Sequence, residues 1–535
     1  MKMTPIIMKL SALMLLLVTG GAASPTSSSS FGPDPESARK NGPQIFNAVH
    51  NAMREFGSAL HHNGMSLFPG TISEGVLLYH GSPTTEVPET FEWLAFEIDH
   101  AETFARGPFG LPKTTRLEHY TEPPPPKGGR PPKPPPFERR PGPGYLHVYQ
   151  ATRPLNILYI DGTAAGKTDM GTLDTQDILL AGNRSTVPFA EWDRARDLCS
   201  LAAEWNIDGL VRMEPGFEVI HCDFTDGLRL LYVNQEPAMD APGAPDNGWI
   251  NVFEWMRAAA SRYYGIGSSR VVLDYSAMVS AFFYPLNLTN PNPKRPELPR
   301  LLGTSDAEMH AVKKHVSAAV ARSLSQKQTP VDWQGVTDMI VTRYARRLLF
   351  IAETDSLDIV RSEVNNLLTV HIDFSGNKTD EGFTFARQRC TDFYLQPVQV
   401  RTPEDELIYA AIENTTATIC KALFDTRQLL VEGHVADEAT ALSATKQLFG
   451  SLMETLRWAE WKDCGPCRSD EVCFIAMWPF GNVEDHDNPS CLNYSIVRDR
   501  NNYWNIPGQW PGPMPNCTME HSCEKREDLL RNEEL

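Results

Sequence analysis

The chain has 535 residues, of which 41% are hydrophobic and 22% are charged. This length predicts two or three domains, because single cores seldom grow much past about 250 residues. With 49 Lys and Arg residues against 67 Asp and Glu residues, the net charge of −18 argues against nucleic acid or an anionic membrane surface as a partner.

The first 23 residues predict a signal peptide. Lys2 and Lys9 precede an apolar run over residues 10–18, and the small side chains at Gly21 and Ala23 suit cleavage after Ala23. The run is too short to cross a bilayer as a helix, and no other stretch approaches the roughly 18 apolar residues that a membrane helix needs. We therefore expect a secreted protein without a membrane span.

Residues 24–43 predict a flexible N-terminus, because they contain a serine run with proline and glycine. A helix is expected over residues 44–60, where Ile45, Val49 and Phe56 fall on one face at the helical period.

Residues 76–82 predict a buried strand that ends in a Tyr-His-Gly sequence, and the glycine, Gly81, allows a ligand to approach the backbone closely. A second short strand at residues 93–96 leads into a helical turn in which Phe104 stands next to small residues. A strand is expected at residues 144–149. Residues 202–211 then lead into a second segment, residues 216–220, which begins Gly-Phe-Glu and contains Glu218.

Together these motifs resemble an ADP-ribosyltransferase domain of the His-aromatic-Glu type. The resemblance implies that Glu218 and His80 are catalytic and that NAD is the substrate, with a protein or a small molecule as acceptor. It assigns NAD binding to Tyr79, His80, Gly81 and Phe104. Across its full length the chain also resembles uncharacterised secreted proteins of filamentous fungi. This second resemblance does not indicate a function.

The chemistry fits these residue types. Cleavage of the nicotinamide–ribose bond passes through an oxocarbenium-like centre that a carboxylate stabilises, and a cationic ring over an aromatic face gains on the order of 1 kcal/mol. The sequence departs from the family in four ways. The aromatic residue is Phe104 where tyrosine is commoner, no Ser-Thr-Ser strand of the arginine-first subclass is present, and a proline-rich insertion splits the domain. In addition, Gly216 stands where an arginine-directed transferase carries an acidic or amide side chain. The alternative is a strand-end histidine, a core phenylalanine and a solvated glutamate.

Residues 123–144 form a proline-rich, basic insertion that predicts an exposed loop; a tolerated insertion is favoured over a docking segment. Residues 157–168 do not form a phosphate-binding loop, because only three residues separate Gly162 from Gly166. No metal site is expected: His310 and His315 would lie about 140° apart around a helix.

The remainder predicts a mainly helical domain. Amphipathic periods and helix-opening residues indicate helices over residues 306–325, 332–353, 404–430 and 438–462. The predicted fold class is thus α+β: a mixed α/β ADP-ribosyltransferase-like domain at 44–235, an α-helical domain at 248–462, a cysteine-rich segment at 463–523 and a charged tail at 524–535.

Ten cysteines and a leader predict disulfides in an oxidising compartment. Cys464 and Cys467 copy a thioredoxin-type Cys-Gly-Pro-Cys sequence, but the expected structural context is missing, which favours a structural role. The disulfide candidates are Cys199, Cys222, Cys390, Cys420, Cys464, Cys467, Cys473, Cys491, Cys517 and Cys523.

Acceptor sequences for N-glycans occur at Asn183, Asn287, Asn377, Asn414, Asn493 and Asn516. The last five residues are similar to a lumenal retention signal, so the endoplasmic reticulum lumen is the alternative to secretion. Two function hypotheses follow: a secreted glycoprotein that consumes NAD by ADP-ribose transfer or hydrolysis, or a non-catalytic secreted glycoprotein that binds a partner.

Overall fold

The structure is a computed structural model that describes residues 31–105, 144–182, 190–237, 247–325, 330–375, 380–432, 437–497, 500 and 502–505. The predicted leader, most of the proline-rich insertion and the charged tail lie outside these ranges. The same holds for Asn183, Asn377, Asn516, Cys517 and Cys523. None of the described helices is both long enough and apolar enough to span a bilayer.

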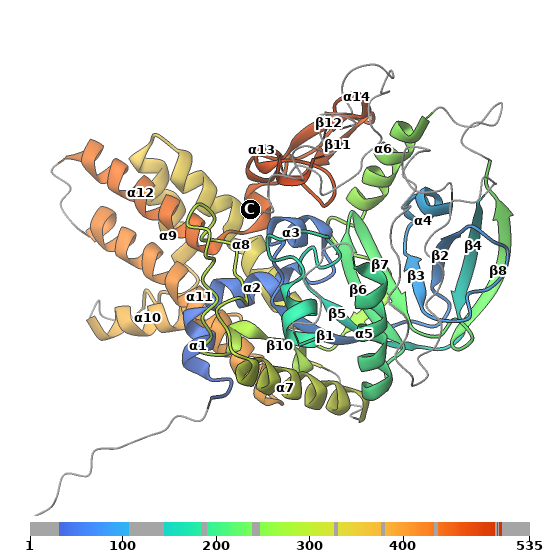
Figure 1. The fold of residues 1–535 in the computed structure, drawn as a ribbon. Coiled ribbons are helices and arrows are strands. Elements are labelled where there is room, and N and C mark those ends of the chain that lie inside the picture. The colour runs from blue at the N-terminus through green and yellow to red at the C-terminus, as the bar shows by residue number, and fades with distance from the viewer. Residues whose placement is uncertain are drawn as a thin grey trace, which may run out of the picture. The chain divides into compact units, whose positions relative to one another are not determined.

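The larger of the two sheets in the described residues has ten strands (Figure 1). Its order is β10-β1-β5-β6-β7-β3-β2-β4-β8, with β9 paired to β1, and only β5 and β6 run parallel. The strands are β1 (Ser66–Ile72), β2 (Leu77–Ser82), β3 (Glu92–Ala95), β4 (Tyr145–Ala151), β5 (Leu155–Ile160), β6 (Gly209–Glu214), β7 (Gly216–His221), β8 (Leu228–Gln235), β9 (Val271–Leu273) and β10 (Val279–Ser280).

Strands β6 and β7 form a tight hairpin at the middle of this sheet, and every residue of both strands is buried. Both are mainly apolar, as expected of strands that are covered on both faces. The turn requires glycine at Gly216, whose φ of 108° is strained for any residue with a side chain. Charged residues within these buried strands therefore need partners of opposite charge.

Helices and a π-helical segment accompany the sheet region. They are α1 (Pro35–Lys40), α2 (Gly42–Asn51), α3 (Glu55–Leu60), α4 (Ile98–Ala105), η1 (Thr175–Leu180), α5 (Glu191–Trp205) and α6 (Asn247–Ala260). The expected helix at 44–60 is thus two helices, because the chain breaks at Met53, which has a φ of 55°.

The predicted flexible N-terminus also needs correction. Residues 35–40 are helical, because Asp34 accepts a hydrogen bond from the backbone N–H of Ser37 and Pro35 fits the first helical turn. Helix α1 lies against α11, so this segment is held by packing.

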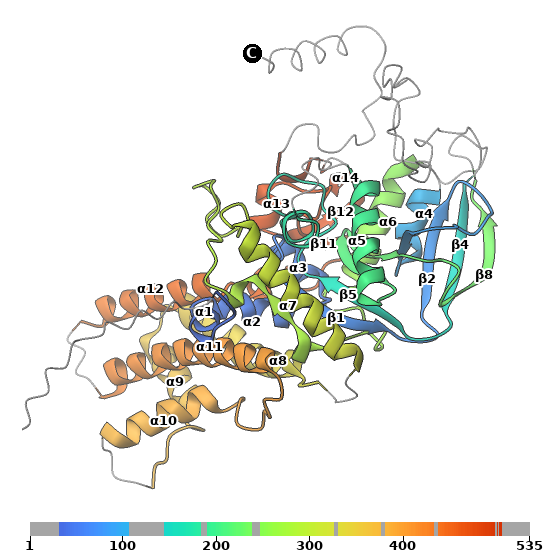
Figure 2. The same cartoon turned by 60° about the horizontal axis from the view of Figure 1, so that its bottom comes forward.

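Long helices make up the C-terminal half, as predicted (Figure 2). They are α7 (Asp306–Ser325), α8 (Trp333–Glu353), α9 (Leu357–Leu368), α10 (Asp380–Asp392), α11 (Pro403–Arg427) and α12 (Glu438–Leu456). Helix α11 packs against α1, α2, α9, α10 and α12, and a capping box between Thr402 and Asp405 fixes its start.

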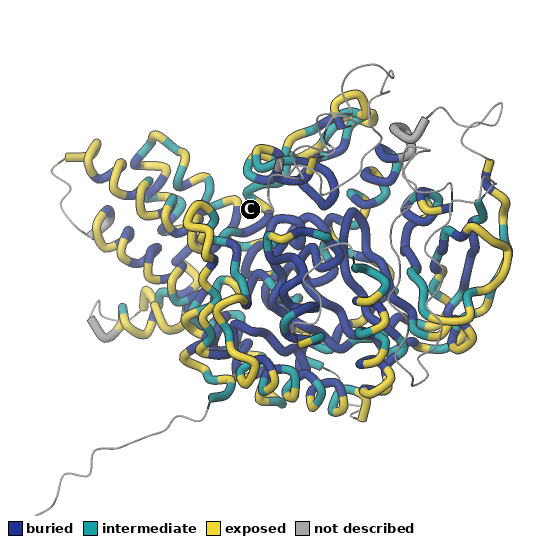
Figure 3. Tube along the Cα trace, viewed as in Figure 1, coloured by how far each residue is buried: buried dark blue, intermediate teal, exposed yellow. Residues whose placement is uncertain are grey.

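The expected domain boundary at residues 235–248 is not where the sheet ends. Strands β9 and β10 pair antiparallel with β1, so residues 271–280 complete the sheet although the sequence around them is helical in pattern. The burial pattern agrees: buried residues run continuously from the sheet into the helices near it (Figure 3). The fold is mixed α/β with a sheet region followed by a helical region.

Four disulfides are formed, which confirms the expectation of disulfide bonds. They join Cys199–Cys222, Cys390–Cys420, Cys464–Cys473 and Cys467–Cys491. The last two staple a small hairpin of β11 (Glu471–Phe474) and β12 (Ser490–Asn493), which two short helices accompany, α13 (Val483–Asp487) and α14 (Tyr494–Val497). Cys464 and Cys467 are not bonded to each other, unlike the cysteines of an oxidised thioredoxin-type site.

Candidate functional site

A buried cluster of charged side chains lies at the β6–β7 hairpin. Arg212 of β6 and Glu218 of β7 are directly opposite in the sheet register, so their side chains share one face. The guanidinium of Arg212 donates through Nε to Glu218 Oε1 at 2.7 Å, and both residues are buried. Glu214 is two residues from Arg212 on the same strand and therefore points to the same face.

Two further groups contact Glu214. Lys167, in the loop after β5, places Nζ 2.5 Å from Glu214 Oε2. His100 of α4 places Nε2 3.7 Å from Glu214 Oε1. The lysine that resembled part of a phosphate loop is thus a partner for a buried carboxylate.

A second layer of charged residues surrounds Arg212. Its Nη1 donates to Gln176 Oε1 of η1 at 2.9 Å, and its Nη2 donates to Glu191 at the start of α5. Arg194 donates to Glu191 at 2.8 Å and to Asp177 at 2.7 Å. Such networks keep a buried arginine fully paired.

The cluster holds four carboxylates, from Asp177, Glu191, Glu214 and Glu218, against the three cations Lys167, Arg194 and Arg212. Burial would raise the pKa of Glu214, but Lys167 and then His100 outweigh it, so that pKa is lowered. Burial raises the pKa of Glu218, and Arg212 offsets this only in part. Of Glu214 and Glu218, Glu218 is therefore the carboxyl that retains a proton more readily, and such opposed pairs are typical of acid–base sites.

His100, Glu214 and Glu218 also have ligand atoms that lie within 4.8 Å of one another. These are ligand types that bind divalent metals. However, Lys167 and Arg212 already neutralise the two carboxylates, so the arrangement does not call for a metal ion. The cysteines near one another at Cys464, Cys467 and Cys491 are bound in disulfides and offer no thiolate.

Aromatic side chains cover this cluster. Trp255 of α6 stacks on His100, with ring centroids 4.8 Å apart, and Phe480 meets Trp255 edge-on at 6.0 Å. Trp478 lies over Lys167 at 4.6 Å. Phe480 and Trp478 belong to the cysteine-rich segment, so that segment closes the site.

The structure places His80 and Glu218 on opposite faces of the sheet, although the resemblance puts both beside one ligand. Ala95 of β3 is opposite both Tyr79 and Glu218, so Tyr79 shares the face of Glu218 and the next residue, His80, does not. His80 donates through Nδ1 to the carbonyl of Trp93 at 2.8 Å. Burial lowers its pKa to about 4, so the imidazole is neutral at neutral pH.

The other predicted residues lie near α4. Phe104 is 49% exposed and its ring centroid is 5.7 Å from that of His100, so it is near the cluster and not in the core. Gly81 packs directly on α4: a Cβ built there would be 2.3 Å from Ala101 O and 2.3 Å from Ala105 N. A ring bound at Gly81 on this face would require α4 to shift.

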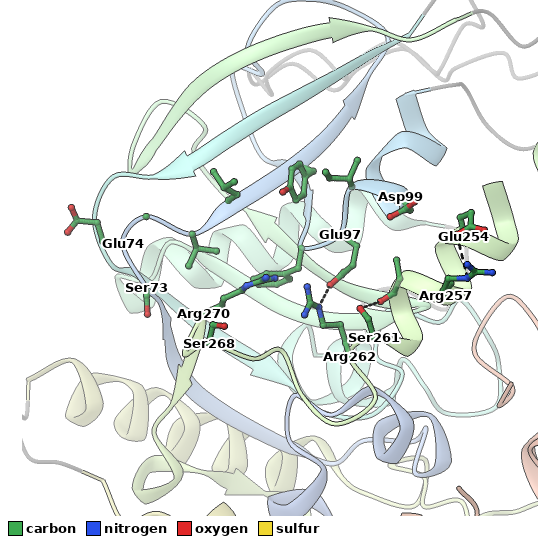
Figure 4. Close-up of a pocket in the computed structure, with 17 residues that line it drawn as sticks. Ser73, Glu74, Glu97, Asp99, Glu254, Arg257, Ser261, Arg262, Ser268 and Arg270 are labelled. Atoms are coloured by element: carbon green, nitrogen blue, oxygen red, sulfur yellow. Dashed lines mark hydrogen bonds and ion pairs between the residues drawn. The ribbon is translucent and has the colours of Figure 1, made fainter. Parts of the chain in front are cut away.

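A groove opens beside Tyr79, on the face that Tyr79 shares with Glu218 (Figure 4). Its volume is about 790 Å³, within the range of small-molecule sites. Residues of β2, the start of α4, the end of α6 and the loop before β9 line it. Glu218 is two strands away from Tyr79, about 10 Å at ordinary strand spacing.

The sequence interpretation missed Arg212, Lys167, His100 and Glu191. One signal was available: Arg212 and Glu214 interrupt an otherwise apolar strand, and a charge in a buried strand is paired or functional. The partners come from segments far apart in the chain, and only the fold brings them together.

Comparison with known proteins gives relatives without a described activity. A family described as the YPL277C N-terminal domain matches residues 36–133 and 118–249. The chain is 27% identical to the uncharacterized protein YOR389W of Saccharomyces cerevisiae, covering 83% of each chain. It is 35% identical to the uncharacterized protein YPL277C of the same yeast, over 39% of this chain and 48% of that one. No solved structure matches significantly. The chain is thus similar to two yeast proteins, and the family match covers the residues that carry the buried cluster.

Proposed function

We propose that the sheet region is an NAD-consuming unit of the ADP-ribosyltransferase type, with Glu218 as its catalytic carboxylate. The observation that carries this proposal is the order β7-β3-β2. It places the glutamate strand, the strand before the aromatic helix and the Tyr-His-Gly strand side by side, with Ala95 between Tyr79 and Glu218.

In this proposal Glu218 stabilises the positive charge that develops on the ribose as nicotinamide leaves. Arg212 holds the carboxylate in one orientation through the 2.7 Å hydrogen bond. Phe104 remains a candidate to stack on nicotinamide, since it is exposed beside His100. His80 drops out of the catalytic set, because it lies on the other face.

The proposed reaction requires that the substrate reach Glu218. Glu218 is buried beneath His100, and α4 packs directly on Gly81. The substrate therefore reaches Glu218 only when α4, or the aromatic cover formed by Trp255 and Phe480, moves aside. Lid movements of this kind are common in enzymes that exclude water during reaction.

We further propose that the protein is a secreted glycoprotein, with the endoplasmic reticulum lumen as the alternative location. Four disulfides support an oxidising compartment. The leader over residues 1–23 and the glycan acceptor sequences support the same route.

The second candidate function is a non-catalytic secreted glycoprotein that binds a partner. A specific observation favours it: Glu218, Glu214 and Arg212 form a closed, fully buried network of the kind that also serves structure alone. In that case the cluster stabilises the β6–β7 hairpin and never meets a substrate.

The test is release of free nicotinamide from NAD by the purified chain, with and without an acceptor protein. Glu218→Gln keeps the shape of the side chain and removes its charge, and Glu204→Gln on the exposed face of α5 is the matched control. We expect release by the unmodified chain and the control, and at least a 100-fold loss in Glu218→Gln. Absence of release from every protein, each folded by circular dichroism, favours the non-catalytic function.

A further inference from the structure

The groove beside Tyr79 combines an apolar wall with a cation that forms no ion pair with any residue that the structure describes. Leu77 and Ile98 line it and are 41% and 42% exposed, large values for such side chains beside a concave surface. The half-buried ring of Tyr79 adds aromatic area between them, and the buried Phe96 lies behind this wall. Exposed apolar side chains that gather around one cavity indicate a binding surface.

Most charges in the groove are already paired. Arg262 donates to Glu97 at 2.7 Å, and Arg257 lies 3.6 Å from Glu254. Both pairs are drawn in Figure 4. Each of these two arginines thus has a carboxylate partner within the groove.

Arg270 differs from these arginines. Among the described residues it forms no ion pair, and its side chain reaches toward the middle of the groove (Figure 4). Burial raises the pKa of Tyr79 and the positive charge of Arg270 partly offsets that rise, so guanidinium and phenol lie in one another's field. A planar guanidinium beside a hydroxyl suits a carboxylate, which accepts two parallel hydrogen bonds from arginine.

The remaining acids of the groove limit the charge of a ligand. In Figure 4 Glu74 lies at the left end of the groove and Asp99 lies to the right of Arg270, and neither acid has an ion-pair partner among the described residues. Among the described lining residues, Arg270 is the cation without an ion pair, and Glu74 and Asp99 would repel a ligand that carries several negative charges. A nucleotide polyphosphate therefore fits poorly, whereas one negative charge matches Arg270.

From this arrangement we propose that the groove binds an amphipathic monocarboxylate. Its carboxylate pairs with Arg270 and accepts from the Tyr79 hydroxyl, and its apolar body lies along the exposed side chains of Leu77 and Ile98. This binding site does not depend on the proposed NAD chemistry at Glu218, because strand β3 lies between the strands of Tyr79 and Glu218 and because Arg270, Leu77 and Ile98 have no part in that chemistry.

Octanoate is the test probe, with octanamide as its neutral analogue and ADP as a polyanion. Isothermal titration of the full chain should show octanoate binding at least tenfold tighter than octanamide and tighter than ADP. Arg270→Gln should weaken octanoate binding at least tenfold, while the exposed Arg196→Gln control leaves it unchanged. Leu77→Glu, at an exposed position that tolerates a polar side chain, should abolish it by placing a like charge on the apolar wall.

Several results would overturn the proposal. They are no binding of octanoate to the unmodified chain, equal affinity for octanoate and octanamide, tighter binding of ADP, or unchanged binding in Arg270→Gln. Nicotinamide release is measured separately, so its loss or presence does not affect the outcome for the groove.

Discussion

The ammonium group of Lys167 lies 4.6 Å from the ring centroid of Trp478. This contact joins the buried charge cluster of the sheet to the cysteine-rich segment, because Lys167 also lies 2.5 Å from Glu214. A cation over an indole ring is stabilised most when water is excluded. The cysteine-rich segment therefore closes the space over the cluster. Burial there lowers the pKa of Lys167, but Glu214, Glu191 and Glu218 outweigh burial and raise that pKa.

Lys167→Met should destabilise the protein by about 3–5 kcal/mol, because removal of one partner leaves Glu214 buried and unpaired. The double variant Lys167→Met with Glu214→Gln should recover part of that loss, which urea unfolding can measure. The exposed pair Lys421 and Asp425 provides the control: Lys421→Met should change stability by less than about 0.5 kcal/mol. Equal losses for the single and double variants would refute coupling between Lys167 and Glu214.

Stability should depend on pH through Asp161, whose pKa burial raises to about 7. In the unfolded chain this carboxyl loses its proton near pH 4, whereas the folded protein holds the proton until about pH 7. The contribution of Asp161 is therefore complete at low pH and falls as pH rises through that interval, by up to about 1.4 kcal/mol per unit.

Asp161→Asn still offers an oxygen to the backbone N–H of Ser66, which the native carboxylate accepts at 2.8 Å. It should remove this part of the pH dependence. The measurement is the free energy of unfolding of both proteins from pH 4 to 8. A difference between them that does not change with pH would contradict the assignment.

The cysteine-rich segment should loosen before the sheet when disulfides are reduced. Each native disulfide contributes about 2–4 kcal/mol, and Cys464–Cys473 and Cys467–Cys491 staple the β11–β12 hairpin. Hydrogen exchange with mass spectrometry should show faster exchange in Glu471–Phe474 than in Gly209–Glu214 after reduction. Catalytic insulin reduction that is lost in Cys464→Ser would instead favour a redox role.

Much of the fold could be predicted because its signals are local. The helix at Asp306–Ser325 was predicted with the same bounds, since the apolar period and the acidic first turn both lie within it. The strand at Leu77–Ser82 and the one that holds Glu218 were also found from short apolar runs.

The sites could be predicted only in part, because they depend on pairing between distant segments. His80 and Glu218 lie in the expected strands, but which face each side chain takes depends on the register through Ala95. The cluster likewise joins His100, Lys167 and Glu214 from three separate segments. No local sequence pattern indicates that these segments come together in the fold. The strands at residues 271–280 were missed for the same reason, because they pair with β1, which lies far away in the sequence.

Glycans should occupy Asn287 and Asn493 but not Asn414 in protein produced through a secretory pathway. Asn414 lies within α11, where its Nδ2 donates to the carbonyl of Arg39 at 2.9 Å and Thr416 of its acceptor sequence is buried. Asn287 is exposed in a loop. Enzymatic removal of glycans in heavy-oxygen water labels each asparagine that carried a glycan, and mass spectrometry then identifies the labelled sites. A label at Asn414 would conflict with this packing.

The most direct test of the proposed site is the initial rate of nicotinamide release from NAD in His80→Gln compared with Glu218→Gln, both checked for folding. The two residues lie on opposite faces of the sheet, so the account predicts that Glu218→Gln loses at least 100-fold in rate while His80→Gln stays within about threefold of the unmodified chain. Loss of activity in His80→Gln with full activity in Glu218→Gln, or no release by the unmodified chain, would contradict it.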